Sequence, residues 1–304
     1  MAPKRPDGAG AFPIPVDTPA PDTPDPAELY AALDLGTNSC RMLIAQPKGN
    51  QFHVVDSFSK SVQLGSGLEA SGRLSRASIS RTVQALRICK GKLERHNVAR
   101  MRLVATEACR RAKNGADFIR LVTRETGMNL EIIEPEEEAR LAVVSCAPLV
   151  STRTEQVLVV DIGGGSTELV WIDLSSVPRL ERPRAIMRLH AGFQSAPSPF
   201  AAARVVDWIS VPLGVATLKD QFHDVEDDAA RFALMSWFFE ENLTDFAPYA
   251  AEQEREGFQI IGTSGTVTTV AASFLGLRRY DRNKVDGLRM TSDQIDRVIR
   301  NYLA

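Results

Sequence analysis

Two stretches of the chain place a carboxylate beside glycines and hydroxyl side chains, a combination that can bind phosphate and metal. In the stretch 157–173, Asp161 ends an apolar, β-branched run and Glu168 follows the turn. The turn contains Gly163, Gly164, Gly165, Ser166 and Thr167. A glycine turn exposes successive backbone N–H groups, so together with hydroxyl donors it can hold a phosphate without a lysine. The two carboxylates are hard oxygen ligands of the kind that Mg²⁺ prefers, although the stretch taken alone is also compatible with a plain turn.

A second copy of this pattern lies 127 residues earlier in the chain, at 29–45. There Asp34 takes the place of Asp161, and the tip consists of Gly36, Thr37, Asn38 and Ser39. Arg41 lies two residues past Ser39, which places both side chains on the same face of the returning strand. One such turn is weak evidence, whereas two in matching context predict an internally duplicated phosphate-binding unit.

A predicted strand at 101–105 is followed directly by polar and basic side chains. Thr106 follows the carboxyl end of this strand and precedes a helix that contains Arg110 and Arg111. Because ligands of open α/β sheets bind beyond the carboxyl ends of the strands, these side chains are placed to face a ligand. The alternative is that both arginines are charges on a helix surface.

Two more segments carry chemistry-bearing residues at element boundaries. The strand 259–262 enters a glycine and hydroxyl turn with Gly265 and Thr266, which is a third candidate phosphate-facing turn. A helix that starts at Pro135 carries three acids, 136–138, in its first turn. Simple stabilisation of the helix dipole is the alternative explanation of these acids.

The composition is typical of a soluble globular protein large enough for two domains, with 304 residues, 44% hydrophobic and 24% charged content. No apolar run approaches the length of a membrane span, and the N-terminus has no hydrophobic signal core. The four cysteines and four histidines are scattered, which argues against zinc and against a histidine-based nucleophile relay. A reducing, cytoplasmic location is expected.

The net charge of −2 conceals two segments of opposite charge. The segment 73–127 has 14 Lys or Arg against 4 acids, and the segment 224–256 has 10 acids against 2 arginines. Charge runs of this kind are often solvated helix faces. A basic segment in an otherwise acidic chain nevertheless suggests that a polyanionic partner binds on one side of the protein.

The elements that position these residues follow from hydrophobic spacing. Apolar residues at helical spacing predict an amphipathic helix over 75–96, and further helices are expected over 225–243 and 291–303. Strands are expected at 52–64, 130–133 and 205–211. The proline-rich leader 1–27 is expected to be disordered, and the insert 175–204, with five arginines against one acid, to be a mobile basic loop.

Five motifs in order resemble those of the exopolyphosphatase/guanosine pentaphosphate phosphatase family. They are DLGTNSCR at 34–41, TEACRRAKN at 106–114, EPEEEAR at 134–140, DIGGGSTE at 161–168 and GTSGTVTT at 262–269. The resemblance implies an α/β fold with two related ribonuclease H-like (actin-like ATPase) domains, whose mixed five-stranded sheets flank a central cleft. We place the first domain at 28–137 and the second at 138–304.

The resemblance also implies roles for individual residues. Glu138 matches the general base, and Arg110 matches the arginine that grips the terminal phosphate. Asp161 and Glu168 match carboxylates associated with Mg²⁺, with Mn²⁺ as an alternative ion, and Asp34 is a third candidate that acts through water. The phosphate-binding residues are expected to be Gly36, Thr37, Asn38, Ser39, Arg41, Thr106, Gly163, Gly164, Gly165, Ser166, Thr167, Gly265 and Thr266.

The function implied by the resemblance is Mg²⁺-dependent release of terminal phosphate from inorganic polyphosphate. Guanosine pentaphosphate is the alternative substrate of the same chemistry, and the basic segment 73–127 is the candidate track for a polyanion. An ATP-using kinase on this fold is disfavoured by the carboxylate before Ala139, and a non-catalytic polyphosphate or nucleotide sensor stays open. No membrane or nucleic-acid partner is expected, and a homodimer is one option for the oligomeric state.

Two features depart from the family pattern. The insert 175–204 replaces a plain turn, so access to the cleft is expected to differ. Family members also continue past the position that matches Ala304 with a helical segment, so the second domain is expected to be incomplete at its C-terminus.

Overall fold

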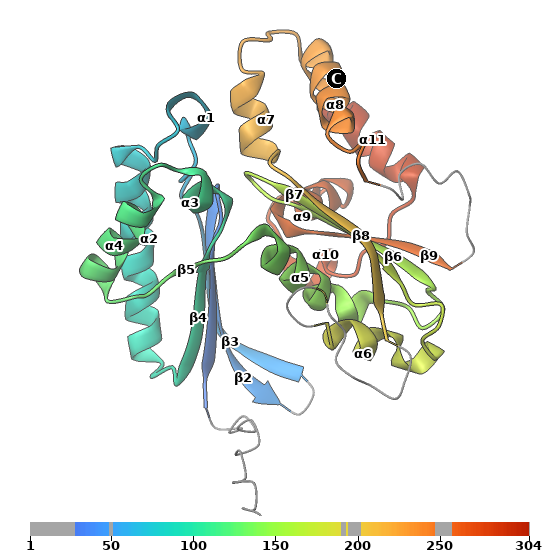
Figure 1. Cartoon of the computed structure of the whole chain (residues 1–304), viewed down its shortest axis with the longest axis horizontal. Coiled ribbons are helices and arrows are strands. Elements are labelled where there is room, and N and C mark those ends of the chain that lie inside the picture. Colours follow the sequence, from blue (N-terminus) through green and yellow to red (C-terminus); the bar gives the residue numbers. More distant parts are fainter. Residues whose placement is uncertain (1–27, 49–50, 190–192, 194–201, 247–256, 304) are drawn as a thin grey trace, which may run out of the picture.

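The computed structural model describes residues 28–48, 51–189, 193, 202–246 and 257–303. The chain forms two α/β halves, each built on a mixed sheet (Figure 1). The first sheet has the order β3-β2-β1-β4-β5. Its strands are β1 (Tyr30–Leu35), β2 (Ser39–Lys48), β3 (Gln51–Ser61), β4 (Arg100–Ala105) and β5 (Glu131–Ile132). Strand β1 pairs antiparallel with β2 and parallel with β4, so the sheet is mixed as expected.

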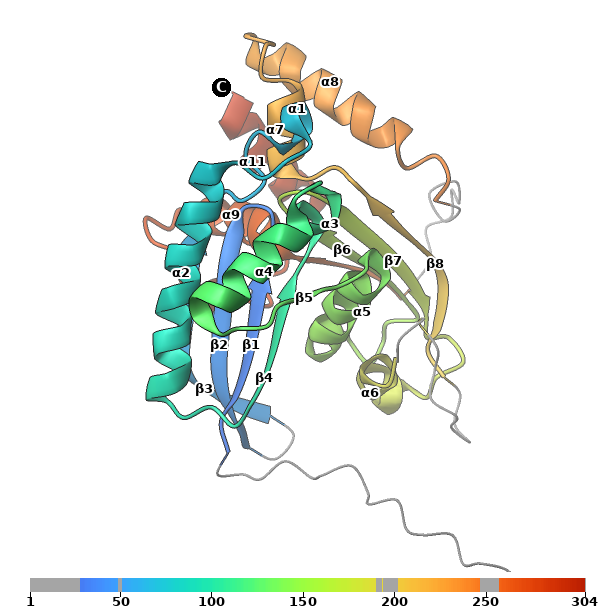
Figure 2. The same ribbon diagram turned by 60° about the vertical axis from the view of Figure 1, so that its left-hand side comes forward.

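Helices α2 (Arg76–Arg95) and α4 (Gly115–Thr126) lie on the side of the first sheet that faces away from the second half (Figures 1 and 2). Two short helices, α1 (Leu68–Ser71) and α3 (Glu107–Arg111), lie at the end of this sheet where the first hairpin turns. Helix α2 confirms the prediction for 75–96, because Val83, Leu86 and Leu93 are buried and Ser75 caps it by accepting from the Ser78 N–H at 3.1 Å.

The second sheet has the order β8-β7-β6-β9, which is four strands among the described residues where the resemblance implied five. Its strands are β6 (Gln156–Ile162), β7 (Thr167–Asp173), β8 (Arg204–Val211) and β9 (Phe258–Thr263). The helices of this half are α5 (Pro135–Cys146), α6 (Arg182–Met187), α7 (Val215–Gln221), α8 (Asp228–Glu241), α9 (Ser264–Phe274), α10 (Arg282–Val285) and α11 (Ser292–Leu303), with short 3₁₀ turns η1 (Ala147–Leu149) and η2 (Arg179–Glu181). In the described part of the chain, no helix combines the length and apolar character needed to cross a membrane. The proposed domain boundary at 137/138 stays a prediction.

The two hairpins that the sequence singled out share one register. In β1–β2, Asp34 pairs with Arg41, and the Gly36 N–H donates to the Ser39 carbonyl at 2.9 Å. In β6–β7, Asp161 pairs with Glu168, and the Gly163 N–H donates to the Ser166 carbonyl at 3.0 Å. Asp34 and Asp161 are each the penultimate residue of their strand, not the last one. The predicted duplication of the unit is therefore matched by equivalent backbone geometry.

The prediction of a mobile loop over 175–204 is wrong for its first part. That part contains η2 and α6, which bury Ala185, Ile186 and the following Leu189. Arg182 is only 3% exposed and donates to the carbonyls of Val177 and Thr152, each at 3.2 Å. The error arises because a buried arginine that bonds to backbone carbonyls has the same sequence signature as a solvated one. Residues 190–192 and 194–201 of this insert, and the predicted leader 1–27, lie outside the described residues.

Helix α2, which belongs to the basic segment 73–127, does not face the space between the two halves. Two of the basic residues of α2 pair with nearby carboxylates, in Arg87–Glu125 at 2.8 Å and Lys92–Asp56 at 2.7 Å. Because α2 and α4 face away from the second half (Figure 1), the structure gives no support to a polyanion track along these helices.

Helix α7 sets the orientation of the second hairpin. The N–H groups of Val215 and Ala216 donate to the carbonyls of Gly163 and Gly164 at 3.2 and 2.8 Å. A Cβ on Gly214 would lie 2.5 Å from the Gly164 carbonyl carbon, so a glycine is needed for this approach. The hairpin carbonyls satisfy the start of α7 and therefore point away from the tip.

We expect Gly214→Ala to lower the free energy of unfolding by about 1–3 kcal/mol, because the methyl group would collide with backbone. Gly91→Ala is the matched control, since Gly91 lies within α2 and nothing lies within 4 Å of a Cβ there. This control should raise the free energy of unfolding by about 0.5–1 kcal/mol. Urea unfolding measures both, and equal stability of the two variants would contradict the assigned role of Gly214.

Candidate active site

The tips of the two hairpins meet between the halves of the chain. A Cβ on Gly165 would lie 2.3 Å from the Thr37 hydroxyl oxygen, and a Cβ on Gly164 would lie 3.0 Å from the Asn38 Cβ. The close approach of the first hairpin therefore leaves no room for a side chain at Gly165 and little room at Gly164. A second contact joins the halves beside the tips, where the Gly67 N–H donates to Asp220 of α7 at 3.4 Å.

Four carboxylates converge beside these tips. Asp34 and Asp161 come from β1 and β6, Glu138 comes from the first turn of α5, and Glu168 comes from β7. Desolvation is the largest cause that raises the pKa of Asp34, Asp161 and Glu168; the charge of Asp161 adds to the rise at Asp34, and that of Glu138 adds to the rise at the other two. The sequence interpretation of 136–138 as dipole-stabilising acids alone is thus insufficient for Glu138.

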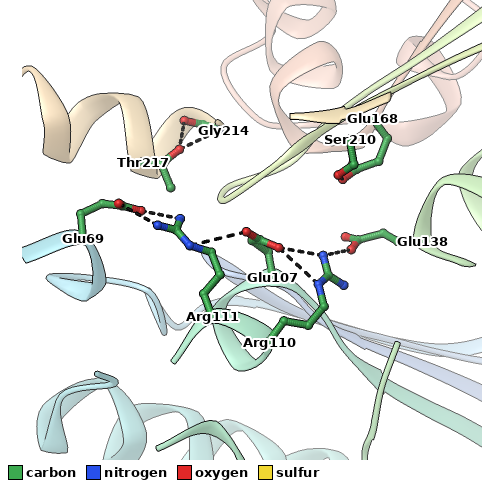
Figure 3. Close-up of polar contacts among 9 residues, drawn as sticks. All are labelled: Glu69, Glu107, Arg110, Arg111, Glu138, Glu168, Ser210, Gly214 and Thr217. Atoms are coloured by element: carbon green, nitrogen blue, oxygen red, sulfur yellow. Dashed lines mark hydrogen bonds and ion pairs between the residues drawn. The ribbon is translucent and has the colours of Figure 1, made fainter. Parts of the chain in front are cut away.

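Glu168 is the most deeply buried of the four, with only 2% of its surface exposed. Burial raises the pKa of Glu168 to about 8, Glu138 adds to the rise, and the hydroxyls of Ser166 and Ser210 oppose it. The Ser210 hydroxyl donates to Glu168 Oε1 at 2.8 Å (Figure 3). Burial and the charge of Glu138 likewise raise the pKa of Asp161 to about 6. Arg41 lowers the pKa of Asp161 but does not cancel the rise, so nearby positive charge does not offset desolvation at either carboxylate.

The carboxylates suit a hydrated Mg²⁺ ion better than a fully caged metal. Within the described residues, no group of three or more His, Cys, Asp or Glu side chains is arranged to hold a metal ion directly. Mg²⁺ commonly keeps several waters and binds through one or two carboxylates and substrate phosphate oxygens. Asp161 Oδ1 is buried and has no hydrogen-bond partner, which is the state of a ligand atom prepared for a cation or its water. The metal roles of Asp34, Asp161 and Glu168 stay predictions.

Arg110 is not a surface charge, because its side chain is only 11% exposed. Its Nη2 donates to Glu138 Oε2 and to Glu107 Oε2, both at 2.9 Å, and its Nη1 donates to the Ile133 carbonyl at 2.5 Å (Figure 3). Burial raises the pKa of Glu138, Arg110 lowers it, and the charges of Asp34 and Glu107 raise it again. The arginine predicted to grip phosphate thus holds the predicted general base in this structure.

The side chains of the predicted phosphate cradle take different directions. The Thr167 hydroxyl donates to the Leu213 carbonyl at 2.8 Å, and the Ser166 hydroxyl interacts with Glu168. The backbone N–H groups of Gly164 and Gly165 donate to no protein acceptor among the described residues, so the tip offers backbone donors. In the first tip, the Thr37 hydroxyl is buried without a partner.

The remaining predicted phosphate ligands surround the two tips. Asn38 is exposed and its side-chain oxygen accepts from the Ser61 hydroxyl at 3.4 Å, while Ser39 and Gly36 are half-buried in the same turn. Thr106 is buried at the start of α3. Their predicted roles as phosphate ligands are neither supported nor opposed by these contacts.

The third predicted turn, at the start of α9, reaches both halves. Ser264 has φ of 74°, a left-handed conformation that is uncommon for serine, and its hydroxyl interacts with Asp161. A Cβ on Gly265 would lie 2.8 Å from Arg41 Nη2, so Arg41 extends from the first hairpin to this turn. Thr266 follows within the first turn of α9 and is half-buried.

Sequence analysis did not single out Glu107, Ser210 or Ser264. Glu107 lies within the TEACRRAKN motif, and its signal would have been an acid placed three residues before Arg110 on a helix. Ser210 is the register partner of Glu168 on a neighbouring strand, and only the pairing of β7 with β8 reveals it.

Comparison with known proteins agrees with this architecture. The sequence model of the Ppx/GppA phosphatase family matches residues 43–274, which is well over half of the chain. The solved PPX-GPPA enzyme of Aquifex aeolicus is 30% identical, with 91% of this chain and 81% of that chain covered and a TM-score of 0.66. A solved exopolyphosphatase-like protein is 28% identical over 91% of this chain and 78% of that chain, with a TM-score of 0.74. An exopolyphosphatase of Cytophaga hutchinsonii, 22% identical over 91% and 80% of the two chains with a TM-score of 0.72, shows the same fold. The fold is of the actin-like ATPase type, as the sequence predicted.

The raised pKa of Glu168 predicts a pH dependence of stability in metal-free protein. A carboxyl group whose pKa is higher in the folded than in the unfolded state binds more protons when folded, so stability falls as pH rises. The window runs from the ordinary value of 4.5 to about 8. We expect the free energy of unfolding of Glu168→Gln, relative to that of wild type, to rise by on the order of 1–3 kcal/mol between pH 5 and 8.

Urea unfolding at several pH values, with a chelator present, measures this gain. Glu94→Gln on the exposed face of α2 is the control and should follow the wild-type curve. Parallel curves for wild type and Glu168→Gln would show that Glu168 titrates normally.

Proposed function

We propose that this chain, which belongs to the Ppx/GppA phosphatase family, is an exopolyphosphatase that hydrolyses the terminal phosphoanhydride bond of inorganic polyphosphate. The observation that carries the proposal is the placement of Glu138 between Arg110 and a group of carboxylates, beside a hairpin tip that offers backbone donors. The similar solved protein described as exopolyphosphatase-like supports the choice of substrate.

In the proposed reaction, each group of residues meets one requirement of phosphoanhydride hydrolysis. The negative phosphoryl oxygens need hydrogen-bond donors, which the N–H groups of Gly164 and Gly165 are placed to supply. The attacking water needs a base, and Glu138, whose pKa is raised, fits this role. Asp161 and Glu168 would hold Mg²⁺, and the ion would neutralise charge on the phosphate oxygens.

In this proposal, the first role of Arg110 is to orient Glu138. Its Nη2 bond to Glu138 at 2.9 Å fixes the direction of that carboxylate before substrate binds. The same guanidinium lies close enough to the base to contact a phosphoryl oxygen that approaches the attacking water. Arg110 would thereby orient the base and stabilise charge in the transition state.

Glu138→Gln should lower turnover on long polyphosphate by at least about 100-fold while binding stays within a few-fold of wild type, because a general base contributes about that factor. Glu136→Gln, two residues earlier on α5, is the matched control and should retain wild-type turnover. Phosphate release and equilibrium binding of polyphosphate are measured on the same preparations.

The same assay separates the candidate substrates. Release of phosphate from guanosine pentaphosphate but not from polyphosphate would replace the proposed substrate and keep the site. Unchanged turnover in Glu138→Gln would remove Glu138 from the mechanism. Tight polyphosphate binding without any phosphate release would favour a sensor.

Asp161→Asn should raise the Mg²⁺ concentration for half-maximal turnover at least about tenfold, because it removes a negative ligand from the metal site. Asp117→Asn on exposed α4 is the control. A Mg²⁺ titration of phosphate release tests this expectation, and an unchanged Mg²⁺ requirement in Asp161→Asn would contradict the metal assignment.

A further inference from the structure

Five charged side chains form a continuous row of alternating sign that ends at Glu138 (Figure 3). The row is Glu69, Arg111, Glu107, Arg110 and Glu138, from α1, α3 and α5. Arg111 pairs with Glu69 through two bonds of 2.6 and 2.8 Å, and its Nε lies 3.7 Å from Glu107 Oε1. Arg110 completes the row by joining Glu107 to Glu138.

We propose that Glu107 is a positioning residue that fixes the Arg110 guanidinium on Glu138, and that Arg111 fixes Glu107 from the opposite side. The part of this proposal that concerns turnover rests on the proposed function of Glu138. The part that concerns the placement of Arg110 does not depend on it.

The contacts of Arg110 show why Glu107 decides its orientation. Glu107 Oε2 accepts from Nη2 at 2.9 Å and from Nε at 3.3 Å, so one oxygen holds two donors of the planar group. Without these two bonds, the guanidinium would keep the Ile133 carbonyl and Glu138 as its only partners among the described residues. Rotation about the side chain would then move Nη2 relative to the Glu138 carboxylate.

Glu107 is itself held from several directions. Glu107 is only 7% exposed. Burial of a carboxylate costs free energy unless charged partners compensate its charge. Arg110 and Arg111, one turn of α3 apart from it, provide this compensation. A Cβ on Gly165 would lie 3.1 Å from Glu107 Cγ, so the tip of the second hairpin packs over its stem. The position of Glu107 therefore depends on both halves of the chain.

A purely structural role is the competing explanation. Buried ion pairs often contribute little net stability, and removal of one partner chiefly leaves the other uncompensated. In that case Glu107→Gln would lower stability but leave Arg110 in place within the folded molecules. The two explanations differ in the mobility of the Arg110 side chain.

Hydrogen exchange at the Arg110 Nε–H, followed by NMR, distinguishes them without any turnover. The resonance is assigned by its loss in Arg110→Lys. In Glu107→Gln we expect exchange at least about tenfold faster than in wild type, because the N–H loses its charged acceptor and the guanidinium becomes mobile; the Arg111 variants, which keep this acceptor, separate the two causes. Arg120→Gln, which breaks the exposed Asp117–Arg120 pair of α4, is the control and should leave exchange unchanged.

Arg111 variants provide a second measurement that does not remove Glu107. Arg111→Gln should also accelerate Arg110 exchange, and Arg111→Lys should restore much of the protection because it keeps a positive charge near Glu107. Exchange at wild-type rates in both Glu107→Gln and Arg111→Gln would overturn the proposal.

Kinetics test the consequence for the reaction. Glu107→Gln should lower kcat on polyphosphate about tenfold and leave KM within about twofold, because a misplaced base affects the chemical step rather than binding. Faster Arg110 exchange with unchanged kcat would overturn the catalytic consequence. Absence of turnover in wild type would contradict the proposed function, while the exchange measurement would still decide the placement of Arg110.

Discussion

Loss of solvation and mutual repulsion at four neighbouring carboxylates are the constraint on which the site depends. Desolvation is the main cause that raises the pKa of Asp34, Glu138, Asp161 and Glu168, and the charges of neighbouring carboxylates add to the rise. Such an arrangement is unfavourable in isolation, because each ionised group loses water and gains like-charged neighbours. The divalent cation of the proposed function would supply the missing charge. The fold maintains this arrangement by spreading the four groups over three strands and a helix that are held by separate cores.

The backbone at the two tips complements this negative group. Carbonyls of Gly163 and Gly164 bond to the start of α7, so the opposite side of the same peptides presents N–H groups. Close contact between Gly165 and Thr37 then brings the donors of one half beside the carboxylate of the other. Anion-binding donors and cation-binding carboxylates are thereby adjacent, which is the arrangement that a metal-bound phosphate requires.

The sequence predicted what depends on local pattern. Both hairpins, the amphipathic helix α2 and the acidic first turn of α5 follow from residue types at short spacing. The contacts that the sequence did not predict join residues far apart in the chain. Ser210 is 42 residues from its partner Glu168, and Glu138 is 28 residues from its partner Arg110. The register between β7 and β8 brings the first pair together, and the approach of the first turn of α5 to α3 brings the second pair together. The buried Arg182 was missed for a related reason, because its carbonyl partners carry no side-chain signal.

The two hairpins differ at one register position, and that difference gives the site its polarity. Opposite Asp34 the first hairpin carries Arg41, whereas opposite Asp161 the second carries Glu168. Arg41 lowers the pKa of both aspartates, so it partly offsets the repulsion that Glu168 increases. Acids at both positions would have added a fifth carboxylate and removed the cation closest to the first tip. With one arginine and one glutamate, the same backbone unit carries a positive side chain in one half and a negative side chain in the other, which is the asymmetry that the proposed binding of a phosphate with its metal would use.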